Sequence, residues 1–514
     1  MNCAFVFVLL APLLPLLAAV GIAVYILAGV PDNRGDDAEP PTARLAEGAA
    51  WGALFVLLAL AGLAFVEGAP GHFTLGTWFA SGDFIAPVSF VVDGLSLGFG
   101  ALVALIGAAT LRFSRQYLHR EAGFHRFFLL MSVFLSGMLT LVLAGNAVLA
   151  FVGWELCGVS SFLLIGYAWE RPTATGGGLY AFVTNRIGDA GFILGISLAA
   201  WWLGTVEWNG LAAWAGDAAR FDKVEARLIL FGLLLAALAK SAQLPFAAWI
   251  GRALEGPTPS SAIFYGALMV HAGVYLVLRL EPVLTQVPDA MTLLAAVGAL
   301  TALHGWLAGM TQTDAKSSLL FATTTQVGLM FLACGLGGFQ LAAWHMTLHA
   351  AWRAWQFLLA PSRLHMAQSR APAPAWLAGR QWLYTAALRR FWLEPVARGV
   401  LIRPTLAVAR EMRELDEKVL AHLVGMPARQ RAGGDAAADA RDDAIRAHGL
   451  PGRLLLWCAD QCLRLERYLV LERVEGTFTR GMRRVGDSLR ALEALLEQPR
   501  YLVLAVAATF VVIL

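Results

Sequence analysis

Long apolar runs recur along most of this sequence, and they constrain its fold more than any other feature. A helix of roughly 20 apolar residues crosses the hydrocarbon core of a bilayer. Eleven runs of about that length occur, at residues 3–30, 49–67, 90–111, 127–146, 147–168, 177–204, 226–250, 258–280, 288–310, 316–336 and 338–361. Hydrophobic residues make up 58% of the chain and charged residues only 15%, whereas soluble domains carry roughly 25% charged residues. The sequence therefore predicts an all-α polytopic membrane protein.

The loops between the runs predict the orientation of the chain. Arginines gather in the loop after the third run and in the loop after the eleventh: Arg112, Arg115, Arg120 and Arg126, then Arg363, Arg370 and Arg380. Short basic loops stay on the cytoplasmic side, so we expect both loops there. Residues 70–90 alternate apolar and polar side chains around Gly and Asp, which predicts a small β-hairpin. The same topology places this hairpin, within an N-terminal region 1–111, on the outside.

The two ends of the chain carry further expectations. The first run is too long for the core of a signal peptide and has no basic residues before it, so we interpret it as a retained span. Residues 381–425 are amphipathic and predict one interfacial or tilted helix. Residues 426–450 are small and charged, as in a flexible linker. Residues 452–498 predict a charged amphipathic surface helix, and residues 501–514 a last short anchor span. This whole tail, residues 365–514, differs in character from the spans.

Several classes of protein are excluded by composition. The formal net charge is +3 and no long basic run occurs in the chain, so we expect no nucleic-acid partner. The five cysteines form neither a CxxC pair nor a Cys/His cluster, which argues against zinc and iron–sulfur sites. The sequence contains no GxGxxG fingerprint. We therefore expect no cofactor, no metal and no catalytic residue of redox chemistry in this chain.

Nine ionisable residues nevertheless lie inside the apolar runs. Each costs about 2.5–3.5 kcal/mol near the bilayer centre, even on the most lenient scale. A single case could be a structural accident, but nine imply a polar axis through the bundle. Proton relays need such titratable groups at spacings that water can bridge. The candidate proton path consists of Glu155, Arg186, Asp189, Lys240, His271, His304, His345, His349 and Arg353.

Two sets within this path have a specific spacing. Glu155 and Lys240 both lie mid-span, and Pro245 follows the lysine and should break its helix. We expect the two charges to stabilise each other, either as a functional pair or as a static ion pair. His345, His349 and Arg353 are spaced i, i+4 and i+8 and should share one helix face. They form a relay in one interpretation; in another, Arg353 extends to the cytoplasmic face.

Four stretches resemble a known family of membrane proteins. GWELCGVSSFLLIGY (153–167), NRIGDAGFILGI (185–196), AKSAQLPFAAWIGRALEGPTPSSAI (239–263) and DAKSSLLFATTTQVGLMF (314–331) are similar to the L subunit of complex I, the NADH–quinone oxidoreductase. The wider family includes large subunits of Mrp sodium/proton antiporters and membrane subunits of hydrogenases and of DAB-type inorganic carbon pumps. The resemblance covers about residues 70–360, and the tail resembles that subunit's lateral helix and anchor span.

The resemblance implies an antiporter-like bundle of inverted repeats and proton translocation coupled to redox chemistry in other subunits. The first repeat would span residues 127–280 and a partial second repeat residues 288–364. Glu155 and Lys240 match the family's essential glutamate–lysine pair, and Asp189 matches the aspartate of its NRIGD motif. His345, His349 and Arg353 match a His-x-x-x-His-x-x-x-Lys series in which arginine replaces lysine.

Departures from the family pattern limit what can be carried over. The family's LPDAMEGPTP is IGRALEGPTP here, and a histidine usual in the eighth span is Tyr265, with His271 six residues later. Arginine at position 353 hardly deprotonates, so it can attract or gate but not relay a proton. The chain also passes from the eleventh run almost directly into the amphipathic tail. The second repeat is therefore expected to be incomplete.

Three functions remain open at this point. The first is a proton-translocating subunit of complex I or a similar assembly, with other membrane subunits as partners and the bacterial inner membrane as its location. The second is the membrane subunit of an inorganic carbon pump, which would power a soluble zinc partner. The third is an Mrp-type antiporter subunit, which would also move sodium.

Overall fold

The computed structural model describes residues 3–31, 35–69, 71–81, 84–364 and 373–415, together with Trp457 and Gln461. The chain divides into two compact units, one of residues 1–22 and 34–402 and one of residues 23–33 and 403–514. The predicted linker 426–450 and anchor span 501–514 lie outside the described residues, as does the surface helix 452–498 apart from those two residues. The site described below belongs to the first unit.

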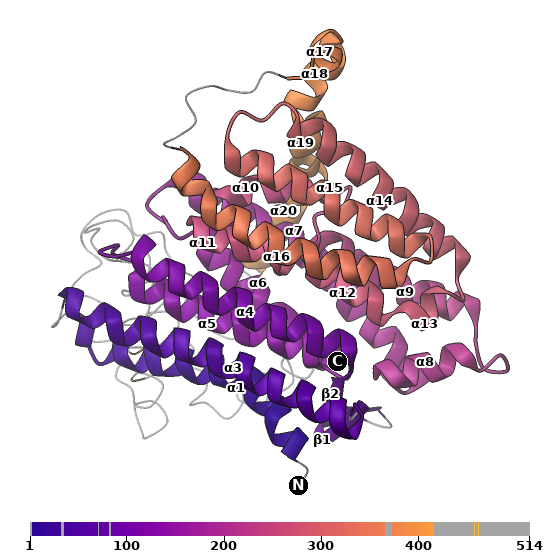
Figure 1. Ribbon diagram of the computed structural model, residues 1–514. Helices are drawn as coiled ribbons and strands as arrows, with labels where there is room; N and C mark the ends of the chain where they lie inside the picture. The colour runs from indigo at the N-terminus through magenta and orange to yellow at the C-terminus, as the bar shows by residue number, and fades with distance from the viewer. Residues whose placement is uncertain are drawn as a thin grey trace. The chain divides into compact units, whose positions relative to one another are not determined.

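The long helices follow the predicted apolar runs (Figure 1). They are α1 (Cys3–Leu27), α3 (Glu39–Glu67), α4 (Gly94–Tyr117), α5 (Phe124–Leu143), α6 (Ala147–Ile165), α7 (Pro172–Leu203), α9 (Lys223–Lys240), α14 (Pro288–Gly309), α15 (Ala315–Gly335) and α16 (Phe339–Leu364). The shorter elements among them are η1 (Gly35–Ala38), α8 (Trp208–Gly216), α10 (Ala248–Arg252), η2 (Ala253–Glu255), α11 (Thr258–Ser261), η3 (Ala262–Ala267), η4 (Met269–His271), α12 (Ala272–Arg279) and α13 (Glu281–Leu284).

The prediction of an all-α polytopic membrane protein is confirmed. Within the described residues, eight helical stretches are long and apolar enough to cross a bilayer. The other three predicted spans correspond to α7, α9 and α16, which are also helical. Two of these helices, α7 and α16, carry Arg186, Asp189, His345, His349 and Arg353. The hydropathy of α7 and α16 is thus lower than that of the eight stretches partly because these two helices carry residues of the candidate site.

Several predicted boundaries were wrong, and two of these differences have clear local reasons. The second span was expected at 49–67, but α3 begins ten residues earlier, at Glu39. Prolines follow in its first turn, where a missing backbone N–H costs nothing. The third span was expected from residue 90, but the chain is still extended to Val92. Asp93 then caps α4 by accepting a hydrogen bond from the backbone N–H of Ser96, as N-cap carboxylates commonly do.

The region of the expected hairpin holds two antiparallel strands, β1 (Gly71–Ser81) and β2 (Phe84–Val92), paired from Gly71↔Val92 to Ser81↔Phe84. The hairpin is tied to the ends of α5, α6 and α7. Asn146 Nδ2 donates to the Pro87 carbonyl at 2.8 Å and to Ser89 Oγ at 2.6 Å, and His72 pairs with Glu207 at 3.1 Å. These contacts hold the hairpin at one end of the bundle.

Close packing of α14 on α15 depends on small residues. A Cβ placed on Gly298 would lie 2.4 Å from the backbone nitrogen of Leu332, so any larger residue would push the helices apart. Small residues allow this approach between membrane helices, where dispersion and not the hydrophobic effect drives association. Figure 1 shows the two helices side by side.

Helix α16 packs against α15 and turns His349 and Arg353 inward. His349 and Arg353 are buried, whereas the opposite face exposes a run of large apolar side chains: Leu341, Trp344, Leu348, Trp352 and Trp355. A soluble amphipathic helix shows the reverse arrangement. This polarity suits a helix that meets lipid or another apolar surface outside and a polar axis inside.

The segment after residue 380 is not the single helix that the sequence predicted. It consists of α18 (Gln381–Leu388), η5 (Arg390–Trp392), α19 (Leu393–Ala397), η6 (Arg398–Ile402) and, in the second unit, α20 (Arg403–Leu415), preceded by the short α17 (Ala375–Ala378). The break comes at three consecutive residues with positive φ, Arg390 (52°), Phe391 (56°) and Trp392 (52°). Left-handed backbone costs a non-glycine residue about 1–2 kcal/mol, so tertiary contacts must stabilise this turn.

Candidate functional site

Four charged side chains form a continuous set between α6, α7 and α9. Arg186 pairs with Glu155 through Nη2, and its Nη1 lies 3.6 Å from Asp189 Oδ2. Asp189 Oδ1 in turn lies 3.9 Å from Lys240 Nζ. The set therefore alternates in sign, as Glu155, Arg186, Asp189 and Lys240. Each acidic group has a cation beside it, which offsets part of the cost of burying it.

Asp189 and Lys240 are the more deeply buried half of this set. Side-chain exposure falls from 34% for Arg186 and 23% for Glu155 to 5% for Asp189 and 1% for Lys240. The indole of Trp154 connects the inner members, because its Nε1 donates to Asp189 Oδ1 at 2.7 Å and its ring faces Lys240 Nζ at 4.9 Å. The Trp154 carbonyl also accepts a hydrogen bond from Lys240 Nζ at 3.4 Å. The lysine ammonium is thus held by a carboxylate, a ring face and a carbonyl.

The expected direct pair of Glu155 and Lys240 is not formed. Among the described residues, Lys240 has one ion-pair partner, Asp189, and Glu155 has one, Arg186. The physical reason is that Arg186 stands one turn before Asp189 on α7 and so lies between the two. The glutamate and the lysine are coupled through this arginine–aspartate relay and not by contact.

Lys240 was expected mid-span in the run 226–250, but it is the last residue of α9, which breaks there. The break continues through Ala242, whose φ is +50°, to the start of α10. Its backbone groups find partners in other elements. The indole of Trp249 donates to the Ala239 carbonyl at 2.9 Å, and the Leu244 N–H donates to Thr301 Oγ1 at 3.0 Å. Irregular backbone at membrane depth is tolerated where neighbouring groups satisfy it in this way, so Lys240 sits at a stable break.

A second broken helix faces the first. The stretch from Thr258 to Arg279 changes from α-helix to π-helix at η3 and then to a 3₁₀ turn that ends at His271. π-Helical turns inside longer helices are frequent at functional sites. Ser241, at the break of α9, donates through Oγ to the carbonyl of Val270 at 2.6 Å. The break that follows Lys240 is therefore joined to the residue before His271.

From His271 a hydrogen-bonded chain runs to α16. His271 Nε2 lies 3.0 Å from His349 Nδ1, and Arg353 Nε donates to His349 Nε2 at 3.4 Å. A neutral imidazole has one donor and one acceptor nitrogen. Because arginine only donates, Nε2 of neutral His349 must accept, and its Nδ1 must carry the proton toward His271. Arg353 thereby fixes the donor-to-acceptor direction of these hydrogen bonds, which runs from Arg353 through His349 to His271.

The remaining histidines differ in their surroundings. His345 Nε2 lies 2.8 Å from Gln326 Oε1 on α15, and its ring is 6.1 Å from that of His349. His304 on α14 is packed edge-on against Phe321 and Phe391, at ring-centroid distances of 6.2 and 5.6 Å. Within the described residues no hydrogen bond or ion pair joins His304 to another predicted site residue. The structure thus brings together eight of the nine candidates in two groups and leaves His304 apart.

Arg353 is only 6% exposed, so the interpretation in which it extends to the cytoplasmic face was wrong. It forms no ion pair with a described residue, which leaves a guanidinium buried against a histidine. A fixed cation at this position opposes the arrival of a second positive charge on His349.

Several residues of the site were missed by sequence reasoning. Trp154 precedes Glu155, and its indole touches both Asp189 and Lys240. Its place before a buried glutamate was a signal that could have been read. Ser241 and Gln326 gave no such signal, because a serine or glutamine in an apolar run is usually a bonded core residue.

Arg390 was also missed. Arg390 lies in the left-handed turn, and its guanidinium is 5.1 Å from the centre of the Phe321 ring. It also donates a hydrogen bond to Gln312 Oε1 at 3.4 Å. Nearby, Glu394 pairs with Arg252 and, at 3.4 Å, with Arg398. These contacts, together with Phe391 on His304, stabilise the strained turn.

Two sequence families match the chain in order. Residues 78–128 match the family described as NADH-ubiquinone oxidoreductase (complex I), chain 5 N-terminus, and residues 144–373 match NADH:quinone oxidoreductase/Mrp antiporter, TM. Subunit 5 of the chloroplast NAD(P)H-quinone oxidoreductase of Mesostigma viride is 36% identical over 61% of this chain and 50% of its own length. Chain 5 of the corresponding enzyme of Picosynechococcus is 38% identical over 56% of this chain and 44% of its own length. The chain spans about half the length of these curated relatives.

Solved structures have the same fold. The Mrp complex from Dietzia contains a chain that superposes with a TM-score of 0.59 at 25% identity, over 95% of this chain and 56% of that one. The archaeal membrane-bound sulfane sulfur reductase superposes with a TM-score of 0.59 at 19% identity, over 70% of this chain and 57% of its own, and shows the fold alone. The resemblance noted from the four motifs is confirmed, and the chain belongs to the family of antiporter-like membrane subunits shared by complex I and the Mrp antiporters.

Proposed function

We propose that this chain translocates protons across the membrane as an antiporter-like subunit of a complex I-like assembly. One observation carries the proposal. A buried lysine ends a broken helix between an alternating set of charges on one side and a histidine chain on the other. Lysine is a compact cation that can release its proton when buried, so Lys240 is the group in this arrangement best suited to carry one.

Arg186 would control the proton on Lys240. The arginine stays charged and lies between Glu155 and Asp189. While it pairs with Glu155, Asp189 stabilises the charged lysine. If Arg186 moves onto Asp189, Lys240 loses much of its counter-charge. Two unit charges about 4 Å apart interact by about 4 kcal/mol at an effective dielectric constant near 20.

His271 would take the proton next, and it would go no further along the histidine chain, because Arg353 opposes a second positive charge on His349. Ser241 links the lysine's break to the turn that carries His271, and His271, His349 and Arg353 continue from there. Arg353 itself cannot extend this path, because it donates hydrogen bonds but does not release protons. His304 and His345 stay candidates for a further branch through α14 and α15.

The proposal is tested with Lys240→Met in the assembled protein. We expect normal insertion and assembly but loss of proton uptake into vesicles, because Asp189 keeps the Trp154 indole and Arg186 as partners. Lys223→Met is the matched control, since Lys223 is the exposed first residue of the same helix α9, and it should keep full uptake. Normal proton uptake by fully assembled Lys240→Met would refute the role of this lysine. Glu155→Gln should reduce uptake as well, by leaving Arg186 to Asp189.

A sodium/proton antiporter subunit is the second candidate. The likeness to a chain of the Mrp complex, over 95% of this chain, favours it specifically. Uptake of protons that depends on an opposing sodium gradient would support this function over the first. Identification of co-purified subunits then distinguishes the assemblies, including a soluble zinc partner as in a carbon pump.

The Picosynechococcus and Dietzia relatives support a bacterial inner membrane as the location of this protein.

A further inference from the structure

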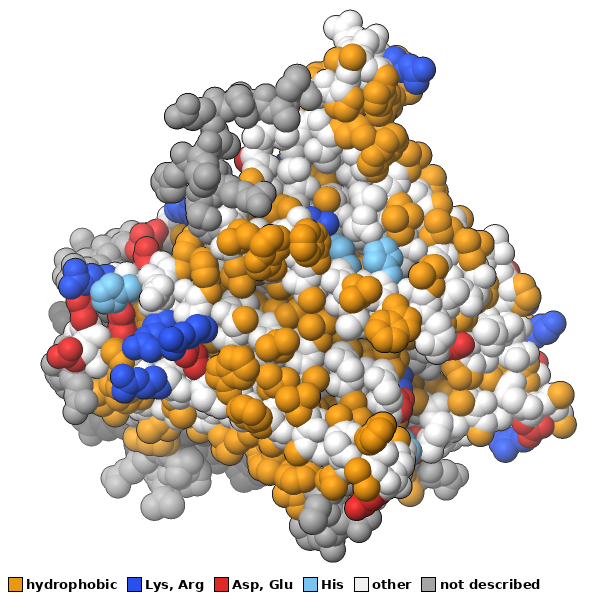
Figure 2. All heavy atoms as spheres, in the orientation of Figure 1, with side chains coloured by type: hydrophobic (Ala, Val, Ile, Leu, Met, Phe, Trp, Pro, Cys, Tyr) orange, Lys and Arg blue, Asp and Glu red, His pale blue; other side chains and the backbone are white. Residues whose placement is uncertain are grey.

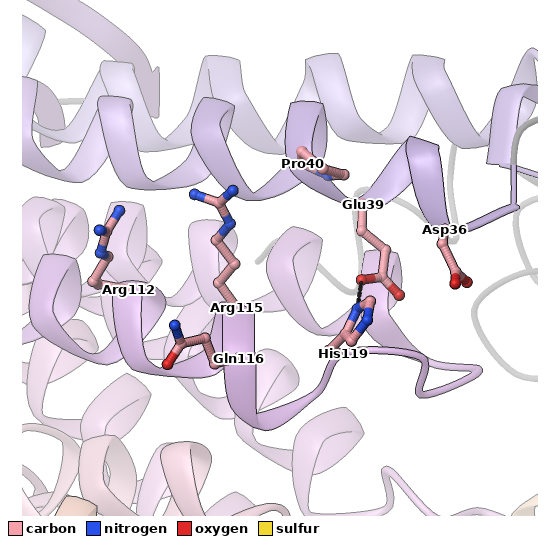
Figure 3. Close-up of a pocket in the computed structure, with 7 residues that line it drawn as sticks. All are labelled: Asp36, Glu39, Pro40, Arg112, Arg115, Gln116 and His119. Carbon is pink, nitrogen blue, oxygen red and sulfur yellow. Dashed lines mark hydrogen bonds and ion pairs between the residues drawn. The ribbon is translucent and has the colours of Figure 1, made fainter.

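A charged cavity lies at one end of the bundle, away from the candidate proton path. It has a volume of about 490 Å³ and is lined by the start of α3 and the end of α4: Asp36, Glu39, Pro40, Arg112, Arg115, Gln116 and His119. The residues from α4 and the turn after it recur at i, i+3, i+4 and i+7, which places them on one helix face. Figure 3 shows Arg115 between Arg112 and the pair formed by Glu39 and His119.

The acidic groups of this cavity already have partners. His119 Nδ1 lies 2.7 Å from Glu39 Oε2, and the backbone N–H of Arg120 donates to Glu39 Oε1 at 2.9 Å. Asp36 pairs with Arg120 at 2.7 Å. Both carboxylates are therefore satisfied within the protein.

The two arginines differ from the acids in this respect. Arg115 makes no hydrogen bond or ion pair with any described residue, although it is only partly exposed. Arg112 makes one long contact, 3.4 Å to Glu47, and its side chain is 70% exposed. Guanidinium groups bind phosphate oxygens in paired hydrogen bonds. The cavity thus offers two adjacent donors suited to an anion.

The position of the cavity identifies the source of that anion. Arg115 lies in the last turn of α4, and both α3 and α4 are long and apolar enough to cross a membrane. The arginines therefore lie at the level of lipid headgroups. Exposed apolar side chains continue along the same two helices, with Leu105 two turns before Arg112, and Leu45 and Phe55 on α3. Figure 2 shows the charged residues gathered at this end, beside a broad apolar surface.

We propose that this cavity binds a membrane phospholipid, with its phosphodiester between Arg112 and Arg115 and its acyl chains along α3 and α4. Basic pockets at the ends of membrane helices bind anionic headgroups in this way. Such a lipid would bridge α3 and α4. This proposal is independent of proton translocation.

The experiment measures lipid retained by the full chain. Delipidated protein is incubated with phosphatidylglycerol or with an uncharged galactosyl diacylglycerol of the same acyl chains, and bound lipid is counted by native mass spectrometry. We expect retention of the phospholipid only. Arg115→Gln should weaken it about tenfold or more, as for the loss of one charge-assisted donor. Because Arg115 has no partner in the described structure, this change removes no hydrogen bond among those residues and should leave folding intact.

Arg171→Gln is the control, since Arg171 is 58% exposed at its side chain and pairs with Glu255 elsewhere. It should keep the lipid. Excess inorganic phosphate separates the two possible sources of the phosphate group. Retained lipid in the presence of phosphate supports a lipid site, and full displacement means that the cavity binds a free anion. That displacement, equal binding of the galactolipid, or unchanged retention by Arg115→Gln would each overturn the proposal.

Discussion

Lys240 Nζ lies 3.9 Å from Asp189 Oδ1, and these are the two most deeply buried charges of the alternating set. Asp189 is shared, because Arg186 and the indole of Trp154 also contact it. Asp189 therefore couples the outer pair, Glu155 and Arg186, electrostatically to Lys240. The relationship leads to a prediction that spacing along the sequence would not suggest.

Asp189→Asn should impair the protein more than Glu155→Gln. The first change removes the counter-charge of Lys240, which is 1% exposed, whereas the second affects Arg186, which is 34% exposed. Loss of one partner of a buried pair costs about 3–5 kcal/mol unless the other partner becomes neutral. We expect lower levels of assembled protein, or assembled protein without proton uptake, for Asp189→Asn. Equal levels and equal uptake in the two variants would contradict this ranking.

Gly273→Ala should destabilise the junction of the two broken helices. A Cβ at this position would lie 2.2 Å from Ser241 Oγ and 2.3 Å from the Ala237 carbonyl oxygen. Overpacking of this kind costs typically about 1–3 kcal/mol. We expect a lower Tm in detergent and reduced proton uptake, because Ser241 can no longer reach Val270.

The control for Gly273→Ala is Gly176→Ala. Gly176 is helical in α7, and a Cβ there meets nothing within 4 Å. Alanine in an open helical position stabilises by about 0.4–1 kcal/mol. A Tm that falls by the same amount in both variants would show that the close contact at Gly273 is unimportant.

The left-handed turn at residues 390–392 predicts effects of different size for two neighbouring glycine substitutions. Trp392 is 49% exposed, so Trp392→Gly loses only part of a ring's packing, and the relief of about 1–2 kcal/mol of backbone strain offsets much of that loss. Its Tm should change little. Phe391→Gly relieves similar strain but loses the ring that packs on His304, and its Tm should fall. Differential scanning fluorimetry of both variants checks this, and equal shifts would contradict it.

The pair of Asp93 and Arg279 predicts a dependence of stability on pH. Burial by itself raises the pKa of Asp93, but the hydrogen bond and charge of Arg279, with hydrogen bonds from Ser96, outweigh it and hold the pKa below its ordinary 3.8. A carboxyl with a lowered pKa contributes stability that is present above the unfolded-state value. This contribution is lost as the pH falls through the folded-state value.

Acidification from about pH 6 to about pH 3 should therefore lower the Tm of the natural protein more than that of Asp93→Asn. At the higher pH, Asp93→Asn should be the less stable of the two, because Arg279 then lacks its counter-charge. Parallel Tm curves over this range would show that the pair contributes nothing to the pH dependence.

Sequence reasoning predicted much of this protein because the bilayer imposes simple rules. A run of apolar residues must be helical where no water is available to bond the backbone, so nearly every predicted span appears as a helix. The cost of a buried charge made the candidate residues stand out one by one. The four motifs added the family, which the comparisons then confirmed.

Tertiary structure alone decided which charges meet. The sequence contains Glu155 and Lys240 but says nothing of the rotation of α7, which inserts Arg186 and Asp189 between them. The helical spacing of residues in α14 and α16 also does not reveal that His349 contacts His271 while His304 packs against Phe391. Apolar length and the cost of a charge are local properties of the chain. The partner of each charge depends on how helices distant in sequence pack, and there the contacts of every neighbour contribute at once.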